Sequence, residues 1–280
     1  MRSPYEILEP TCISFSGGRT SAYMLWRVLE AHGGKLPEDA IVCFANTGKE
    51  DEATLKFVHD CETNWNVPIV WLEYTDADEP KDRWKQVTYE TASRDGEPFE
   101  AVIRKKCYLP NPVTRFCTIE MKIRTIANYL FHIGMCEKRS HGENMAWVGI
   151  RADEPRRAAK IPRDRTPLVA AGVTKEMVGE FWRNQSFDLE LPNINGVTYH
   201  GNCDLCFLKG ASQTMSLIQE KPERAIWWAG MENQAKNFCE KVSGQVFRQD
   251  RANYADMMKF AQDQTDFFGD DESISCFCGD

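Results

Sequence analysis

Long apolar runs are missing from this sequence of 280 residues. No stretch approaches the ~18 apolar residues that a membrane-spanning helix needs, and the opening MRSPYEILEP has no apolar core like that of a signal peptide. Internal repeats and low-complexity segments are missing as well, and 42% hydrophobic with 27% charged residues is ordinary for a globular protein. The sequence therefore excludes a fibrous or disordered chain, and it predicts a cytoplasmic protein without a membrane partner.

An excess of positive charge is also missing. The 34 Lys and Arg residues are outnumbered by 42 Asp and Glu residues, which gives a net charge of −8. A protein that binds nucleic acid regardless of sequence needs a broadly basic surface, so this class is disfavoured. A local basic pocket for a phosphorylated small molecule stays open.

Nine of the 34 basic residues gather in two segments. One segment flanks Cys117 and the other follows residue 150; together they contain Arg115, Lys122, Arg124, Arg151, Arg156, Arg157, Lys160, Arg163 and Arg165. Each of these residues taken alone could be an ordinary solvent-exposed residue whose charge is balanced by neighbouring Asp and Glu side chains. As a set they favour a pocket for a polyanion, and the four that we expect to line it are Arg115, Lys122, Arg151 and Arg157. A nucleic-acid strand would use the same residues.

Apolar patterns that alternate between strand and helix periods predict an α/β fold. Strands are expected at 11–15, 40–45, 69–74 and 146–150, and helices after residue 21, at 50–63 and at 119–133. In the last of these helices the spacing predicts a buried stripe of Ile119, Ile123, Ile126 and Leu130. This order predicts a parallel sheet with helices on both faces.

The chain divides by pattern into three parts. We expect an α/β domain over 1–170, with an irregular insertion at 76–118. A helical lobe is expected over 171–269, with helices at 174–184, 211–220, 222–240 and 252–263. Residues 270–280 are expected to form a flexible tail.

The segment SGGRTS, residues 16–21, stands between the first predicted strand and its helix. Glycines there allow a ligand to approach the backbone closely, and a helix N-terminus with nearby hydroxyl groups suits a phosphate. The spacing is that of neither a GxxxxGK[ST] nor a GxGxxG loop, and a simple helix cap is the alternative. Two further segments end predicted strands at the same edge of the sheet, residues 46–48 (NTG) and 149–151 (GIR).

Eleven cysteines are many for a reducing compartment and suggest metal or redox chemistry. Cys203 and Cys206 form a CxxC pair, and Cys107 and Cys117 lie far upstream. Four thiolates would ligate a [4Fe–4S] cluster or a tetrahedral zinc ion. A thioredoxin-like redox pair is less favoured, because the CxxC follows the polar segment NINGVTYHGN instead of opening a helix after a strand.

Several of these segments together resemble a known family. SGGRTS resembles the SGGxxS loop of the PP-loop nucleotide α-hydrolase superfamily. FANTGKE, TRFCTIEMKI, VGIRADEPRR and GNCDLC are similar to segments of the phosphoadenosine phosphosulfate (PAPS) reductase family, in the divergent branch found in phages and mobile elements. The resemblance covers residues 11 to about 210. It implies a Rossmann-like, parallel five-stranded sheet and a bound adenine nucleotide, either ATP or an adenylyl sulfate, with room for Mg²⁺.

The resemblance also implies roles for individual residues. The phosphate or sulfate end of the nucleotide would be held by Ser16, Gly17, Gly18, Arg19, Thr20 and Ser21. The rest of the nucleotide would lie near Asn46, Thr47, Gly48, Gly149, Ile150 and Arg151. The pair Arg19-Thr20 departs from the Lys-Asp of many reductases, but Arg19 keeps the positive charge and adds a planar fork suited to oxyanions.

For the cysteines the resemblance favours a [4Fe–4S] cluster over zinc. Phe116 stands where the family has the first of two adjacent cysteines, so the ligands would be Cys117, Cys203, Cys206 and either Cys107 or a tail cysteine. The family ends in a mobile segment whose cysteine attacks the sulfate sulfur. Cys278-Gly279 resembles that segment, although its Glu and His are absent, and Cys276 would be a resolving thiol.

Three functions follow from the resemblance. The first is an adenylyl-sulfate reductase with catalytic Cys278, Cys276, Arg151 and Arg157 and a thiol reductant such as thioredoxin. The second is an ATP-dependent sulfur-transfer enzyme, an ATP pyrophosphatase that modifies nucleic acid. The third is a non-enzymatic nucleotide sensor. A homodimer is compatible with each.

Overall fold

The computed structural model describes residues 2–194 and 197–269, and they divide into two units. The first unit consists of Met1–Lys105 and Phe116–Cys203, and the second of Lys106–Arg115 and the chain from Asp204 onward. The prediction of a domain boundary at residue 170 stays a prediction. Cys276 and Cys278 lie outside the described residues.

A five-stranded sheet forms the centre of the first unit, in the order β4-β3-β2-β1-β5. Its strands are β1 (Thr11–Phe15), β2 (Ala40–Asn46), β3 (Ile69–Glu73), β4 (Lys85–Val87) and β5 (Ala146–Val148). β1 pairs in parallel with β2 and β5, and β2 pairs in parallel with β3. The predicted strands at 11–15, 40–45 and 69–74 are confirmed to within a residue, whereas the strand predicted at 146–150 ends two residues earlier.

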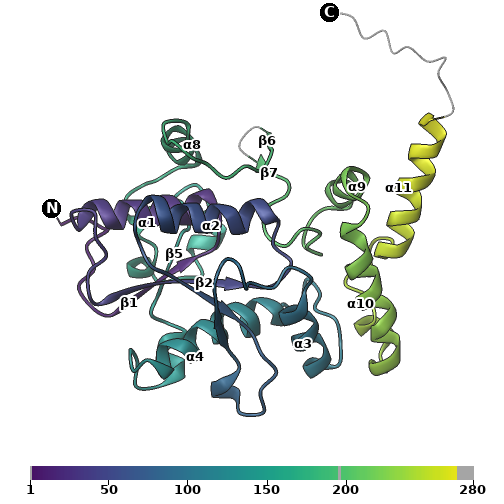
Figure 1. The fold of residues 1–280 in the computed structure, drawn as a ribbon, viewed down its shortest axis with the longest axis horizontal. Coiled ribbons are helices and arrows are strands. Elements are labelled where there is room, and N and C mark those ends of the chain that lie inside the picture. Colours follow the sequence, from purple (N-terminus) through teal and green to yellow (C-terminus); the bar gives the residue numbers. More distant parts are fainter. Residues whose placement is uncertain (1, 195–196, 270–280) are drawn as a thin grey trace, which may run out of the picture. The chain divides into compact units, whose positions relative to one another are not determined.

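Helices cover both faces of this sheet (Figure 1). α1 (Arg19–Ala31) and α2 (Glu52–Asn64) pack on one face, where Ile13 and Phe44 join their apolar side chains. α4 (Thr125–His132) packs on the other face, against Cys12 and Leu72. Strands buried on both faces are rich in apolar residues on both sides, which explains why β1 and β2 stand out in the sequence. The remaining helices of the unit are α3 (Glu97–Lys106), α5 (Arg139–Gly142), α6 (Pro155–Ala158), α7 (Pro167–Ala170) and α8 (Lys175–Arg183).

The prediction that all five strands are parallel is wrong for β4. This strand pairs antiparallel with β3, Trp71 opposite Val87 and Glu73 opposite Lys85. Parallel neighbours need a crossover, usually a helix, whereas a chain that turns back directly pairs antiparallel. The connection from β3 to β4 contains only a single 3₁₀ turn, Pro80–Asp82. The predicted insertion at 76–118 thus contains β4, which is an edge strand of the sheet, and the helix α3.

Of the four residues predicted to form a buried stripe on the helix at 119–133, two are exposed. Ile126 and Leu130 are buried, but Ile119 is 44% exposed and Ile123 is 41% exposed. The cause is a π-helix over Thr118–Arg124, directly before α4. Its i→i+5 hydrogen bonds widen each turn, so side chains spaced for an α-helix no longer share one face.

The second unit is helical, with α9 (Ala211–Glu220), α10 (Arg224–Phe238) and α11 (Tyr254–Gly269). Trp228, Phe247 and Tyr254 pack together in its core. The buried Glu232 carboxylate accepts hydrogen bonds from the N–H groups of Phe247 (3.2 Å) and Tyr254 (2.9 Å). Burial raises the pKa of Glu232 despite these bonds.

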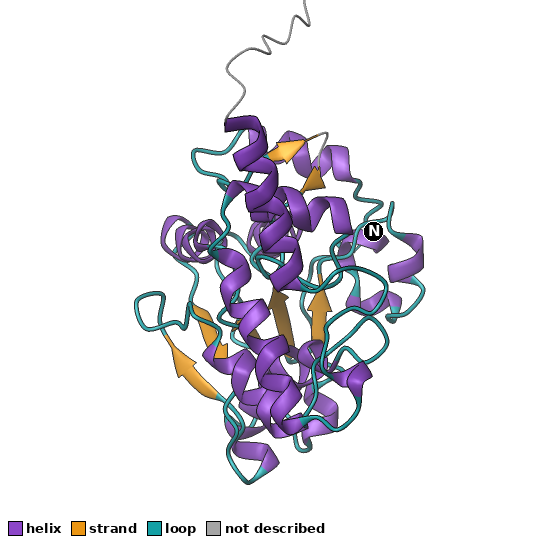
Figure 2. Ribbon diagram, turned by 90° about the vertical axis from the view of Figure 1, so that its right-hand side faces the viewer, coloured by secondary structure: helices purple, strands orange, loops and turns teal. Residues whose placement is uncertain are grey.

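Figure 2 marks strands in orange, and the two short arrows at its top are β6 (Asn193–Ile194) and β7 (Val197–Thr198), a hairpin of the first unit. None of the helices in the described part of the chain combines the length and the apolar character needed to cross a membrane.

Candidate functional site

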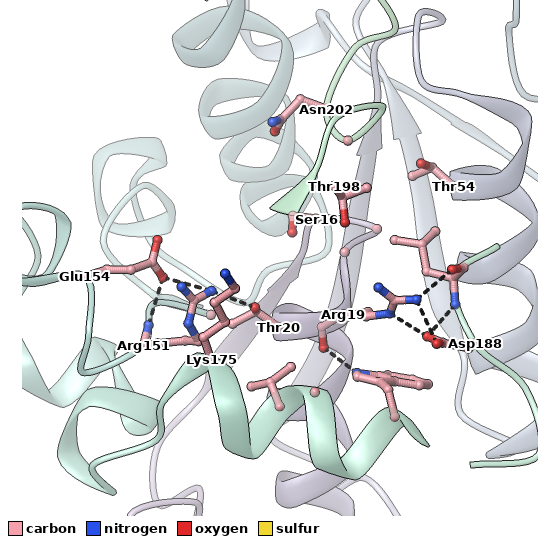
Figure 3. A pocket seen from close by; sticks show the side chains of 18 of the residues that line it. Ser16, Arg19, Thr20, Thr54, Arg151, Glu154, Lys175, Asp188, Thr198 and Asn202 are labelled. Carbon is pink, nitrogen blue, oxygen red and sulfur yellow. Dashed lines mark hydrogen bonds and ion pairs between the residues drawn. The ribbon is translucent and has the colours of Figure 1, made fainter. Parts of the chain in front are cut away.

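A cavity of about 620 Å³ opens in the first unit beyond the ends of β1 and β5. The chain runs from β1 outward to β2 and β3 and then returns to place β5 on the other side of β1. Open α/β sheets bind ligands at such a reversal, outside the carboxyl ends of the strands. The volume of the cavity is also typical of small-molecule sites. The lining includes Gly17, Gly18 and Gly149. It also includes Ser16, Arg19, Thr20 and Arg151 (Figure 3).

Two glycines shape the turn after β1 in different ways. Gly17 has φ +75°, and a Cβ there would lie 2.6 Å from Thr54 Cγ2 and 3.3 Å from Phe44 Cε2. Gly17 is therefore required by the backbone and by the packing of α2. Gly18 has extended backbone, and a Cβ there would meet only Ser16 Oγ at 3.8 Å. Gly18 is thus the position of the turn at which the backbone is open to the cavity.

The hydroxyl of Ser21 closes the turn from inside. It donates to the Gly18 carbonyl (2.9 Å) and accepts from the Ser16 N–H (3.1 Å). Gly18 is the N-cap of α1, and as a glycine it brings no side chain to cap the first turn of the helix. The N–H groups of that turn carry the partial positive charge of a helix N-terminus, at the wall of the cavity.

Arg19 is held by a partner that lies far away in the sequence. Its Nε and Nη2 donate to the two carboxylate oxygens of Asp188 at 2.6 and 2.7 Å, and Nη2 also donates to the Leu189 carbonyl at 3.0 Å. The Arg19 carbonyl in turn accepts a bond from Trp182 Nε1 at 3.0 Å. Arg19 therefore ties the start of α1 to the segment after α8, and its guanidinium lies beside Asp188 in the cavity wall (Figure 3).

The segment after β5 brings two more arginines to the cavity. Arg151 donates to Thr20 Oγ1 (3.2 Å) and to Asp153 Oδ1 (2.8 Å), and its N–H bonds Glu154 Oε2 (3.1 Å). Arg157 pairs with the other oxygen of Glu154. Burial alone would raise the pKa of Asp153, but the hydrogen bond and charge of Arg151 outweigh it and lower that pKa below its usual value. The predicted residues Arg151 and Arg157 are thus brought together.

One face of α8 completes the wall, with Lys175, Val178, Gly179, Trp182 and Arg183. The helix was expected at 174–184, but its part in the site was missed. The sequence signal was the spacing of Lys175, Gly179 and Arg183 by four residues, which puts two cations and a bare backbone on one helix face. In total five cationic and two anionic side chains line the cavity, although the protein as a whole is acidic.

Comparison with known proteins finds a phage relative. The chain is 30% identical over 217 residues to the uncharacterized nin region protein ORF290 of Escherichia phage lambda, an alignment that covers 75% of this chain and 70% of that protein. The chain belongs to the family of this phage protein. It is also 26% identical over 155 residues to the uncharacterized protein MJ0066 of Methanocaldococcus jannaschii, and there it spans 25% of the archaeal protein's length. No family model and no solved structure matches the chain.

In this member of the family, the predicted residues at the end of β2 do not line the cavity. Asn46 Nδ2 donates to Glu73 Oε1 (2.7 Å) and to the Ser93 carbonyl (2.8 Å), and its Oδ1 accepts from the Gly48 N–H (3.0 Å). Glu73 is fully buried and also binds Lys85 Nζ at 2.9 Å. Gly48 has φ +76°, and a Cβ there would lie 3.1 Å from the Gly96 backbone. Asn46 and Gly48 therefore shape the loop.

Thr47 belongs to a second polar cluster in the first unit. Its Oγ1 donates to Glu50 Oε2 (2.7 Å) and lies 3.4 Å from Cys203 Sγ. Lys122 Nζ lies 3.5 Å from Glu50 Oε1. Burial alone lowers the pKa of Lys122, but the charges of Glu50, Cys203 and Cys117 outweigh it and raise the pKa. The cluster joins the end of β2 to the start of the CxxC segment.

The remaining predicted residues are divided among different parts of the chain. Ile150 is buried, whereas Gly149 lets the end of β5 approach α1, since a Cβ there would lie 3.0 Å from Ser21 Cα. Arg115 belongs to the second unit and donates to the Pro112 carbonyl at 3.2 Å. Of the predicted metal ligands, two belong to each unit, Cys117 and Cys203 to the first and Cys107 and Cys206 to the second. Over the described residues, neither unit by itself groups three or more His, Cys, Asp or Glu side chains for a metal ion.

Proposed function

We propose that the first unit binds an adenine nucleotide through its phosphate or sulfate groups, in the cavity beyond β1 and β5. The observation that carries the proposal is the coincidence of an α1 N-terminus led by Gly18 with five cationic side chains at the reversal of the sheet. Helix N-termini and arginine forks both suit oxyanions. With the resemblance of its segments, this supports a Rossmann-like member of the PP-loop superfamily, close to the PAPS reductase family.

The reaction proposed is reduction of an adenylyl sulfate. The Cys278 thiolate would attack the sulfate sulfur, and the bond from sulfur to the phosphate oxygen would break. The nucleotide would leave with its 5′-phosphate, whose oxygen keeps the electron pair of the broken bond. A second thiol, for which Cys276 is the candidate, would then attack Cys278 Sγ and release sulfite. The two thiols supply two electrons and end as a disulfide, which a thiol reductant such as thioredoxin would reduce. Arg151 and Arg157 would stabilise the charge on the leaving phosphate.

A [4Fe–4S] cluster is part of this proposal as the cofactor implied by the cysteines. Cys107, Cys117, Cys203 and Cys206 have the thiolate chemistry that such a cluster takes. The charges of Cys203 and Cys117 both raise the pKa of Lys122 in the first unit, and a neighbouring cation favours the thiolate form that a cluster needs. A bound cluster would supply electron-transfer or sulfur chemistry, and no step of the reduction above depends on it.

ATP-dependent sulfur transfer to a nucleic acid is a second candidate, favoured by one observation. Cys203 lies at 3.4 Å from Thr47 in the first unit itself, so a thiol stands near a strand end independently of the tail. ATP, with Mg²⁺, would then activate the acceptor and release pyrophosphate.

The two reactions are separated by their products. We would incubate anaerobically purified protein with adenosine 5′-phosphosulfate, with its 3′-phosphorylated form, and with ATP, and measure sulfite and pyrophosphate. Sulfite release that Cys278→Ser abolishes supports the reductase, as does a sulfonate that accumulates on Cys278 when the resolving thiol is removed by Cys276→Ser and reductant is left out. Pyrophosphate release that persists after truncation behind Glu272 supports the second candidate, and no turnover of any of the three substrates contradicts both.

A further inference from the structure

Each acidic side chain of the cavity wall is already bonded to arginine. Asp188 holds Arg19, and Glu154 holds both Arg151 and Arg157. The partners in the ion pair of Glu154 and Arg157 differ in exposure: the side chain of Glu154 is 17% exposed, whereas that of Arg157 is 62% exposed. The carboxylate of Glu154 is therefore a negative charge in the wall of a site whose five cationic side chains would attract anions.

We propose that Glu154 is a specificity-determining residue, an internal anion that competes with any ligand anion for Arg151 and Arg157. Glu154 Oε2 lies 3.1 Å from the Arg151 N–H and 3.6 Å from Arg151 Nη1, where an oxygen of a bound phosphate or sulfate would also bond. An incoming anion has to displace this carboxylate or share the two guanidinium groups with it, and in either case the like charges repel each other.

This competition selects ligands that offer more than a charge. Inorganic phosphate or sulfate brings only the anion. The repulsion from Glu154 therefore lowers the affinity of the cavity for these free anions, and no other contact compensates for it. A ligand whose anion is attached to a nucleoside gains further contacts across the cavity, and these offset the repulsion. The inference deepens the proposed function and rests on it for the nucleoside, but the competition itself concerns the arginines and any oxyanion.

Glu154→Gln tests the competition, because glutamine keeps the shape and the acceptor oxygen while it removes the charge. We would titrate inorganic phosphate into the wild type and the variant by calorimetry. Removal of a full charge a few ångströms from a bound anion at a protein surface raises affinity about tenfold, so we expect the dissociation constant to fall by about that factor. Phosphate at the dissociation constant of the variant occupies half of the variant sites but only about a tenth of the wild-type sites, so it competes with nucleotide much more strongly in the variant.

Glu180→Gln is the matched control, since it changes the net charge equally on an exposed residue of α8 outside the cavity lining. Its phosphate affinity is expected to equal that of the wild type, and an equal gain in both variants would mean a net-charge effect and overturn the proposal. Glu154→Ala removes the charge in a second way, and an unchanged phosphate affinity in whichever neutral variant folds also overturns it. If phosphate binding improves while no nucleotide binds any form, the proposed function fails and the competition stands.

Discussion

Replacement of Gly18 by valine tests the cavity at a position where the fold does not need a glycine. Gly18 has φ −110° and ψ 158°, extended backbone in which a β-branched residue is comfortable. The added Cβ meets no atom closer than Ser16 Oγ at 3.8 Å, so the two methyl groups enter open space at the cavity wall. We therefore expect the free energy of unfolding to change by less than about 1 kcal/mol.

The same methyl groups would stand between a bound oxyanion and the first turn of α1. Each hydrogen bond from a backbone N–H to a charged group contributes about 1.5–3 kcal/mol. Loss of two such bonds weakens binding by at least about 100-fold. The assay is titration calorimetry of wild type and variant with ATP and with an adenylyl sulfate, beside urea unfolding of both proteins.

Gly17→Val is the matched comparison on the neighbouring residue. Here valine is forced to φ +75° and its Cβ lies 2.6 Å from Thr54 Cγ2, so the protein itself should lose about 2 kcal/mol of stability or more. A Gly18→Val protein that is stable and binds nucleotide as tightly as the wild type would refute the placement of the anion at the N-terminus of α1.

Three further predictions concern other parts of the structure. Asn46→Ala removes a 2.7 Å bond to the buried Glu73 carboxylate and should lower the free energy of unfolding in urea by about 2–3 kcal/mol; an unchanged value would refute this. The lowered pKa of Asp153 means that its contribution to stability is complete above the unfolded pKa of about 3.9 and is lost as the pH falls through the folded value. Asp153→Asn should therefore flatten the acid limb of a stability profile measured between neutral and acidic pH. Anaerobically purified protein should be brown with about four iron atoms per chain, and Cys203→Ser should lose most of them; a colourless protein with one zinc ion would contradict the cluster.

Sequence patterns predicted the parts of the fold that depend on local periodicity. β1, β2 and β3 are largely buried on both faces, so each is rich in apolar residues and bounded by polar turns. The π-helix over Thr118–Arg124 was not predictable from such a pattern, because apolar spacing is judged against the period of an α-helix. β4 was missed because its three residues carry little pattern of their own and are largely exposed.

The candidate site was predicted where its residues stand in sequence motifs and was missed where distant segments meet. The turn after β1 and the segment after β5 were both expected at the cavity. Asp188, which bonds Arg19 across 169 residues of sequence, carried no local signal. The reason for Gly17 was also hidden, since only the fold shows that a Cβ there would strike Thr54 in α2.

The most direct test of nucleotide binding in the first unit is an NMR titration that identifies which residues respond to the ligand. We would titrate ¹⁵N-labelled protein with an adenylyl sulfate and with ATP and follow the amide resonances. The account predicts saturable shifts centred on residues 16–20 and 149–151, with smaller changes along α8. Shifts confined to other parts of the chain, or no shift with either nucleotide, would contradict it.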